Sequence, residues 1–382
     1  MAESGALGGP DGRFRAAYGA GEGWEDALEA CLTALATPPA GANLGLVYAT
    51  DVLADRLGEI VQRLRAATGI QDWLGTVGTG VSACGLELHD RPALALLVGA
   101  LPEDAFRVIE PVSDNLSAFE DRHGRWIAER GPYFGVVHGD PRTVGLADLL
   151  ADLSAASASF LVGGLSASRG EMWQVAGGEA ARGGLSGALF APDLKVVTGL
   201  SQGCTPIGPR RTITEAEDNL VKRIDERPAV EVFVEDIGEL LARDLRRVGG
   251  YVYVAFPIAE SDTGDYLVRN LTGIDTDQGW LGVGHNVTAG DRIQFCRRDH
   301  AAAVEDLQRM LADVKARCDG PPRAGLYYAC VARGPNLFGD QSEELRLIRD
   351  ALGEFPLVGF FANGEISHDR LYGYTGVLAL IL

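Results

Sequence analysis

The chain has 382 residues, 46% of them hydrophobic, and 50 glycines that follow no strict period, which excludes collagen-like and low-complexity proteins and predicts a globular chain of at least two domains. Its 34 basic and 53 acidic residues give a net charge of −19, which argues against binding to nucleic acid or anionic membranes, because both rely on clustered Lys and Arg. No apolar run approaches the roughly 18 residues of a membrane span, and the six cysteines form no Cys-x-x-Cys pair, so we expect a soluble, cytoplasmic protein without a metal or cofactor.

In chain order, residues 1–22 are expected to be disordered. Three later segments then repeat one plan: a short apolar strand, an amphipathic helix, a strand that carries glycine, and a final apolar strand. These segments span 45–98, 135–190 and 325–380. The helices are predicted from apolar residues at i, i+3, i+4 and i+7, and the strands from short apolar runs bounded by Gly or Pro. Recurrence in one order predicts a repeated βαββ unit.

Between the second and third repeats the pattern changes. It predicts strands at 230–234, 251–256, 281–284 and 292–295 and helices at 236–248 and 301–315. Residues 201–209 are too rich in Gly and Pro for a regular element, so a domain boundary is expected within 200–228. We assign one domain to 23–226 and a second to 227–382.

The predicted fold class is α+β or α/β, because strands and helices alternate along most of the chain. Consecutive strands after each helix favour two layered helix–sheet–sheet–helix domains over a doubly wound Rossmann fold. Gly75, Gly78 and Gly80 follow a helix rather than opening one, which argues against a dinucleotide loop. The sequence has no phosphate-binding loop, no zinc-protease motif and no nucleophile elbow in the right context, so we expect no catalytic site and no enzyme activity.

Two stretches are candidate ligand sites. In the first, Cys204, Pro206 and Gly208 either line a pocket or form a tight crossover between domains, and no positive neighbour in the sequence activates the Cys204 thiol. The second joins two segments of the third repeat, where Arg333 is suited to clamp a carboxylate and Glu365 to accept an ammonium group. Together these two side chains would complement the charged ends of an amino acid. Alternatively, Arg333 and Glu365 form a salt bridge with each other, or they are unrelated charges on two loops. The other candidates in this stretch are Asn336, Phe338, Gly339, Phe361 and Asn363.

From these residues, the chain from about 24 to its end resembles the FIST family (F-box and intracellular signal transduction). The resemblance rests on Ser201–Gly208, Leu337–Gly339, Pro356–Ile366 and Tyr374–Gly376, in that order. It implies a FIST N domain over about 43–226 and a FIST C domain from about 227. It further implies a sensory module for a small ligand, with amino acids or related metabolites suggested for the family. Because no kinase or cyclase output is visible, a stand-alone sensor of this kind would signal through a separate protein.

Two alternatives to the sensor stay open. A layered αββα fold is also compatible with a hydrolase that frees a Ser, Thr or Cys at a chain terminus, and no such terminus is evident. The third possibility is a scaffold that binds a protein partner through an exposed strand edge formed by residues 377–382.

Overall fold

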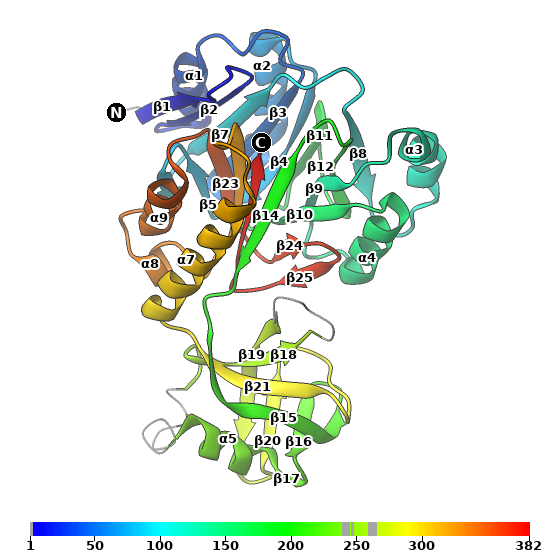
Figure 1. The fold of residues 1–382 in the computed structure, drawn as a ribbon, viewed down its shortest axis with the longest axis vertical. Coiled ribbons are helices and arrows are strands. Elements are labelled where there is room, and N and C mark those ends of the chain that lie inside the picture. The colour runs from blue at the N-terminus through cyan, green and yellow to red at the C-terminus, as the bar shows by residue number, and fades with distance from the viewer. Residues whose placement is uncertain (1–2, 239–244, 246–247, 259–265) are drawn as a thin grey trace. The chain divides into compact units, whose positions relative to one another are not determined.

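The computed structural model describes residues 3–238, 245, 248–258 and 266–382. The chain forms two compact units (Figure 1). Unit 1 comprises Met1–Ser201 and Gln308–Leu382, and unit 2 comprises Gln202–Leu307. Each unit is built around sheets that bury apolar side chains.

Unit 1 contains three β-sheets. Sheet I runs in the order β1 (Glu3–Gly8), β2 (Phe14–Ala20), β7 (Ala93–Gly99), β3 (Leu44–Thr50), β4 (Asp72–Gly78), β11 (Gln174–Gly177) and β12 (Glu179–Ala181). Sheet II runs β25 (Arg370–Tyr372), β24 (Glu365–Ser367), β10 (Phe160–Leu165), β9 (Phe134–Gly139), β13 (Leu185–Phe190) and β8 (Phe106–Val112). Sheet III runs β14 (Val196–Ser201), β26 (Gly376–Ile381), β22 (Ala324–Cys330), β23 (Leu357–Ala362), β5 (Gly80–Ala83) and β6 (Leu86–His89).

The three predicted βαββ repeats are confirmed, and each forms the centre of one sheet. In every repeat the first two strands are parallel, as in β3–β4, β9–β10 and β22–β23. The last strand of each repeat, β7, β13 or β26, lies antiparallel on the other side of the first. Repetition of the sequence plan therefore becomes repetition of strand order and direction.

Each repeat also supplies strands to a neighbouring sheet. The hairpin β5–β6, which follows β4 of the first repeat, pairs with β23 of the third. The hairpin β11–β12 of the second repeat pairs with β4 of the first, and β24–β25 of the third pairs with β10 of the second. The exchange is cyclic, so the three repeats are mutually interlocked and none completes its own sheet.

Each repeat has a glycine in the middle of its second strand, because the backbone of the first strand lies too close to leave room for a Cβ atom. A Cβ at Gly75 would lie 1.7 Å from the carbonyl oxygen of Val47, and one at Gly359 would lie 1.6 Å from that of Tyr327. Gly163 occupies the same register position in the second repeat. The glycines that mark the repeat in the sequence are therefore explained by contact between paired strands.

Helices cover the outer faces of the sheets in unit 1. The helical elements are α1 (Trp24–Leu35), the short 3-10 helix η1 (Asp51–Arg56), α2 (Leu57–Thr68), α3 (Ser117–Arg130), α4 (Leu146–Ser157), α8 (Pro335–Phe338), α9 (Glu343–Leu352) and the part of α7 (His300–Arg317) that begins at Gln308. The apolar faces of α1 and α2 pack on sheet I, and those of α3 and α4 on sheet II. On sheet III, α7 covers β14, where a side chain on Gly199 would meet Met310 and Val314.

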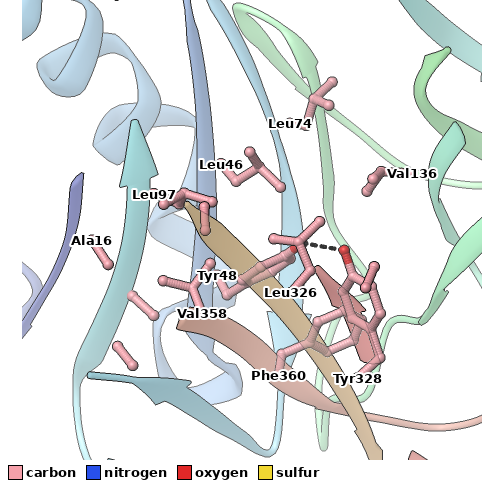
Figure 2. Close-up of a cluster of buried hydrophobic side chains, with 14 of the residues drawn as sticks. Ala16, Leu46, Tyr48, Leu74, Leu97, Val136, Leu326, Tyr328, Val358 and Phe360 are labelled. Carbon is pink, nitrogen blue, oxygen red and sulfur yellow. Dashed lines mark hydrogen bonds between the residues drawn. The ribbon is translucent and has the colours of Figure 1, made fainter. Parts of the chain in front are cut away.

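The inner faces of the three sheets share one hydrophobic core (Figure 2). At its centre lie Tyr48, His138 and Tyr328, the fifth residues of β3, β9 and β22, and all three are fully buried. The Tyr48 hydroxyl lies 3.2 Å from His138 Nε2 and 3.0 Å from the Tyr328 hydroxyl. Burial lowers the pKa of His138 to about 3, so this imidazole stays neutral. Equivalent positions of the three repeats therefore meet in one uncharged polar contact, which we call the central triad.

Unit 2 is built on one antiparallel sheet that closes on itself. Its elements are β15 (Thr205–Glu217), β16 (Leu220–Ile224), β17 (Arg227–Pro228), α5 (Ala229–Ile237), β18 (Val252–Pro257), β19 (Tyr266–Asp275), β20 (Trp280–Val283) and β21 (Arg292–Arg297). The strand order is β15-β21-β18-β19-β20-β16-β17, and an additional β15–β16 pairing joins the two sides. The apolar residues of α5 pack into the core of this sheet.

The α+β class predicted from the sequence is confirmed, but several details differ. Strands β1 and β2 pair along their length in sheet I, so the predicted disorder of 1–22 is wrong for Glu3–Ala20. The predicted strand at 230–234 lies within helix α5, and the predicted helix at 236–248 falls largely outside the described residues. Thr205–Glu217 forms a strand despite its prolines and glycines, because a register shift between Ile207 and Arg211 accommodates them.

The arrangement of the units also differs from the predicted pair of layered domains. All three repeats belong to unit 1, because β22, β23 and β26 share sheet III with β14 and β5. The division at 226/227 therefore does not coincide with the compact units, which separate at Ser201 and again at Leu307. Strand β26 lies between β14 and β22, so residues 377–382 do not form the exposed edge expected for a scaffold.

Candidate functional site

A cavity of about 320 Å³ lies in unit 1 beside the carboxyl ends of several strands. Val331 directly follows β22, Phe361 lies near the end of β23, and Arg169 follows β10. The full lining is Thr79, His89, Asp90, Arg169, Val331, Pro335, Asn336 and Phe361. Carboxyl ends of parallel strands are where α/β proteins commonly bind ligands, since loops there project functional side chains over the sheet.

The cavity lining includes the guanidinium of Arg169, which two carboxylates hold in place. Its Nε and Nη2 each lie 2.7 Å from an oxygen of Asp51, and its backbone N–H donates to the same carboxylate. Nη1 donates to Asp90 at 2.9 Å. The side chain of Asp51 is 2% exposed and that of Arg169 is 60% exposed, so a buried carboxylate orients an accessible cation.

This pairing affects the protonation of both groups. Although burial of Asp51 acts to raise its pKa, the hydrogen bonds and the charge of Arg169 hold that pKa below its usual value. The hydrogen bond to Asp51 and its charge raise the pKa of Arg169, which therefore stays cationic. A guanidinium has five N–H donors, and three of them are used here. One N–H on each Nη atom has no acceptor among the described residues.

Other lining residues of the cavity provide an aromatic surface and hydrogen-bond acceptors. The Phe361 ring is buried and lies 4.5 Å from the His89 ring, measured between centroids. Asn336 donates its amide N–H to the carbonyl of Val331 at 3.0 Å, which leaves its side-chain oxygen as an acceptor. Asp90 contributes a second acceptor through the carboxylate oxygen that does not contact Arg169.

The buried carboxylate of Glu87 lies next to His89. The His89 Nε2 atom is 3.6 Å from a Glu87 oxygen, too far for a good hydrogen bond. Burial raises the pKa of Glu87, and the neighbouring His89 acts in the opposite direction.

The predicted anchor Arg333 belongs to a buried ion pair rather than to the cavity wall. Its guanidinium is fully buried and lies 2.6–2.7 Å from one carboxylate oxygen of Glu344 on α9. It also donates to the carbonyl and the hydroxyl of Ser201 and to the carbonyl of Tyr374, at 3.3–3.5 Å. Burial acts to lower the pKa of Arg333, but the charge of Glu344 outweighs it and keeps the group cationic.

Glu365, the other half of the predicted clamp, is also fully buried. Its carboxylate accepts hydrogen bonds from the backbone N–H and the hydroxyl of Thr375, at 3.0 and 2.7 Å. Burial raises its pKa to about 8. Arg333 attracts Glu365 electrostatically but forms its ion pair with Glu344. The structure therefore does not form the predicted Arg333–Glu365 clamp, because α9 supplies a closer carboxylate.

The remaining predicted residues fall into three places. Asn336 and Phe361 line the cavity, and their contact with a ligand stays a prediction. Phe338 is buried, with its ring 5.1 Å from the Arg333 guanidinium, whereas Gly339 and Asn363 are exposed. The other three belong to unit 2: Cys204 is buried just before β15, and Pro206 and Gly208 are exposed on that strand.

Sequence reasoning missed the cavity residues Thr79, His89, Asp90 and Arg169, and the orienting residue Asp51. A signal for two of them was present in the repeat. Asp51 follows the first strand of repeat one, and Arg169 follows the glycine-bearing strand of repeat two. Charged residues at such strand ends are candidates for ligand binding, but only the hairpin exchange brings different repeats to one cavity.

Other site classes find less support in the described part of the chain. None of its His, Cys, Asp and Glu side chains gather in groups of three that could hold a metal ion. No described helix combines the length and the apolar character needed to cross a membrane.

The fold and the comparisons with known proteins define the class. Residues 43–227 match the model of the FIST N domain, and residues 229–368 match that of the FIST C domain. The chain therefore belongs to the FIST family, whose domains are sensory domains associated with signal transduction.

Its relatives include mycobacterial proteins. The chain is 30% identical to the uncharacterized protein Rv0628c of Mycobacterium tuberculosis over 368 residues, which cover 91% of this chain and 92% of that protein. It is 32% identical to the uncharacterized protein Mb0898c of Mycobacterium bovis over 200 residues, about half of each chain.

Proposed function

We propose that this protein is a non-enzymatic sensor that binds an amino acid or a related small metabolite in the cavity of unit 1. The observation that carries the proposal is the Arg169 guanidinium, oriented by buried Asp51 and retaining two free N–H groups at the cavity. As a FIST protein it would pass the signal to a separate partner protein.

The cavity residues match the two charged ends of an amino acid. The N–H groups that Arg169 leaves free suit a ligand carboxylate, since guanidinium–carboxylate hydrogen bonds are short and strong. The side-chain oxygens of Asp90 and Asn336 suit an ammonium group, and Phe361 offers an apolar surface to a side chain. A volume of about 320 Å³ is at the small end of the range for ligand pockets and suits a metabolite of this size.

A thermal-shift screen against single amino acids tests the proposal, because a ligand that binds only the folded state raises its melting temperature. The key variant is Arg169→Gln, and Arg142→Gln is its matched control. Arg142 is half-exposed and donates hydrogen bonds to the Asp140 carboxylate through its backbone N–H, Nε and Nη2, as Arg169 does to Asp51. It does not line the cavity. We expect a ligand that stabilises the wild type and Arg142→Gln but not Arg169→Gln. Equal stabilisation of all three proteins would contradict the assignment of the carboxylate anchor.

A hydrolase remains the second candidate, favoured by one observation. Thr79 and His89 line the same cavity and together offer a hydroxyl and an imidazole. A nucleophile–base pair would need these groups within hydrogen-bond reach, and no such bond joins them in the structure. The two functions are separated by incubating the protein with the ligand from the screen: a sensor returns it unchanged, whereas product accumulation that Thr79→Val abolishes would establish the enzyme.

A further inference from the structure

Arg169 and Asp90 at the cavity of unit 1 place opposite charges side by side. The Nη1 atom of Arg169 donates to a carboxylate oxygen of Asp90 at 2.9 Å, and the two side chains are 60% and 76% exposed. Among the described residues, one N–H on each Nη atom of Arg169 and the second oxygen of Asp90 have no hydrogen-bond partner. Both charged groups can therefore bind a ligand while they stay in contact with each other.

The two carboxylates that hold Arg169 are fixed relative to each other by Thr50. This buried residue ends β3 and directly precedes Asp51. Its hydroxyl donates to the carbonyl of Arg91, the residue after Asp90, at 2.7 Å. Asp90 itself has a φ of +53°, in the left-handed region that Asp adopts more readily than most residues. The position of Asp90 beside Arg169 is therefore set by the fold before any ligand binds.

This contact limits the distance between the charged groups of a ligand. A carboxylate bound to the N–H groups of Arg169 and an ammonium group bound to Asp90 must lie as close together as their protein partners do. In an α-amino acid a single carbon atom carries both groups, whereas in 4-aminobutyrate a flexible chain separates them and would have to be ordered on binding. The geometry therefore favours α-amino acids.

The rest of the lining offers no second cation to an acidic side chain. Arg169 is the only arginine or lysine among the described residues that line the cavity, and the α-carboxylate needs its remaining N–H groups. The Nε2 atom of His89 is buried 3.6 Å from a Glu87 oxygen, and Nδ1 packs against Gly80, where a Cβ would lie 2.2 Å away. A second ligand carboxylate would compete with the buried Glu87 carboxylate for this imidazole, so an acidic side chain is disfavoured.

The surface that remains for the side chain of a ligand is mainly apolar. Val331 and Phe361 contribute hydrocarbon to the lining, and the His89 ring packs on Phe361 with 4.5 Å between centroids. One α-ammonium group uses the acceptors of Asp90 and Asn336, so a second ammonium group would lose its hydration without gaining a carboxylate. An apolar side chain loses no such hydration and gains from being removed from water.

We infer that the cavity selects α-amino acids with an uncharged, apolar side chain, and that Asp90 recognises the α-ammonium group. This inference rests on the proposed function and names the class of ligand within it. Arg169 holds the α-carboxylate, Asp90 holds the α-ammonium group, and the wall around Phe361 contacts the side chain.

Isothermal titration calorimetry of the full-length wild type tests the ligand class with five compounds: L-leucine, L-phenylalanine, L-glutamate, L-lysine and 4-aminobutyrate. We expect leucine or phenylalanine to bind at least about tenfold more tightly than the other three, because a surplus or misplaced charge leaves polar groups unpaired. Glutamate, lysine or 4-aminobutyrate binding within that margin would overturn the inference and leave the sensor function standing. If none of the five binds, the inference fails, and the thermal-shift screen against all amino acids decides whether the sensor function fails with it.

Two substitutions test the role of Asp90. Asp90→Asn keeps the shape and a hydrogen-bond acceptor but removes the charge, and Asp193→Asn is its matched control. Asp193 is a half-exposed carboxylate paired with Arg130, and it does not line the cavity. We expect Asp90→Asn to weaken leucine binding at least about tenfold, because a hydrogen bond between charged groups is lost, while Asp193→Asn keeps the wild-type affinity. Unchanged leucine affinity in Asp90→Asn would overturn the assignment.

The compound 4-methylpentanoate, which is leucine without its ammonium group, separates recognition from positioning. Its affinity should be the same for the wild type and Asp90→Asn, because it has no group for Asp90 to bind. Equal losses for leucine and 4-methylpentanoate would show that Asp90 only orients Arg169, and would overturn its assignment as the residue that recognises the ammonium group.

Discussion

Two arginine–carboxylate pairs in unit 1 share a local geometry but differ in what they can do. Arg169 binds Asp51 and Arg333 binds Glu344, each through Nε and Nη2. The Arg169 side chain is 60% exposed and borders a cavity, whereas both side chains of the Arg333 pair are fully buried. An exposed guanidinium can exchange water for a ligand, but a buried one needs all its protein partners to offset desolvation.

The comparison shows that burial, rather than residue type, separates an arginine that a ligand can reach from a structural one. The buried pair resembles a ligand anchor in the sequence, because Arg333 is followed by Gly334 and Pro335 in a strand-end loop. In the structure Glu344 on α9 forms a buried ion pair with Arg333, so this guanidinium is not accessible to a ligand. The accessible charge that borders the cavity comes instead from Arg169, in the loop after β10.

The largest expected effect comes from breaking the buried pair. Glu344→Gln leaves the Arg333 charge without a counter-ion in the core, so we expect a loss of about 3–5 kcal/mol in the free energy of unfolding. Urea denaturation followed by circular dichroism measures this loss. A cost below about 1 kcal/mol would show that the two pairs are equivalent and would contradict the distinction between them.

A second effect on stability is expected from Glu365, whose pKa is raised from 4.5 to about 8. Between these values the folded state holds a proton that the unfolded state has released, so the wild type loses stability as the pH rises from about 4.5 to 8. Glu365→Gln cannot ionise and should gain on the order of 3 kcal/mol relative to the wild type between pH 4.5 and 7. Urea titrations at several pH values measure the difference, and parallel profiles for the two proteins would contradict it.

The central triad supplies a buried polar contact that carries no charge. Tyr48→Phe removes the hydroxyl that bridges His138 and Tyr328, so we expect a cost of roughly 1–3 kcal/mol from unpaired polar groups. Tyr328→Phe removes only an end of the network and should cost less. The same denaturation measurement ranks the two variants, and the reverse order would show that Tyr48 is not the bridging group.

The smallest effect on stability is expected at the Arg169–Asp51 pair, because its cation is exposed. Asp51→Asn keeps a hydrogen-bond acceptor and leaves Arg169 in contact with water, so the cost should be about 1 kcal/mol or less. The substitution should nevertheless weaken ligand binding, because Arg169 loses its orienting carboxylate. Ligand titration calorimetry alongside denaturation separates the two effects, and unchanged affinity would show that Asp51 does not position the anchor.

Sequence reasoning was most successful where local pattern determines structure. The βαββ repeat follows from apolar periodicity and from glycines such as Gly75 and Gly359, each of which faces a carbonyl across a strand pair. It was wrong at Val230–Val234, where a β-branched run forms a helix, because packing against the closed sheet of unit 2 outweighs intrinsic propensity.

The candidate site was harder to predict because it depends on contacts between repeats. Asn336 and Phe361 were predicted from one repeat, and both line the cavity. His89 and Arg169 reach the same cavity only through the exchanged hairpin β5–β6 and the loop after β10. A pattern within one repeat holds no information about such a contact.

The most direct test of the central claim is a crystal structure of the protein with the tightest-binding amino acid from the screen. We expect the ligand in the cavity of unit 1, with its carboxylate about 2.7–3.2 Å from the Nη atoms of Arg169. A ligand bound elsewhere, or one whose carboxylate contacts a different residue, would contradict the assignment of Arg169 as the sensor's anchor.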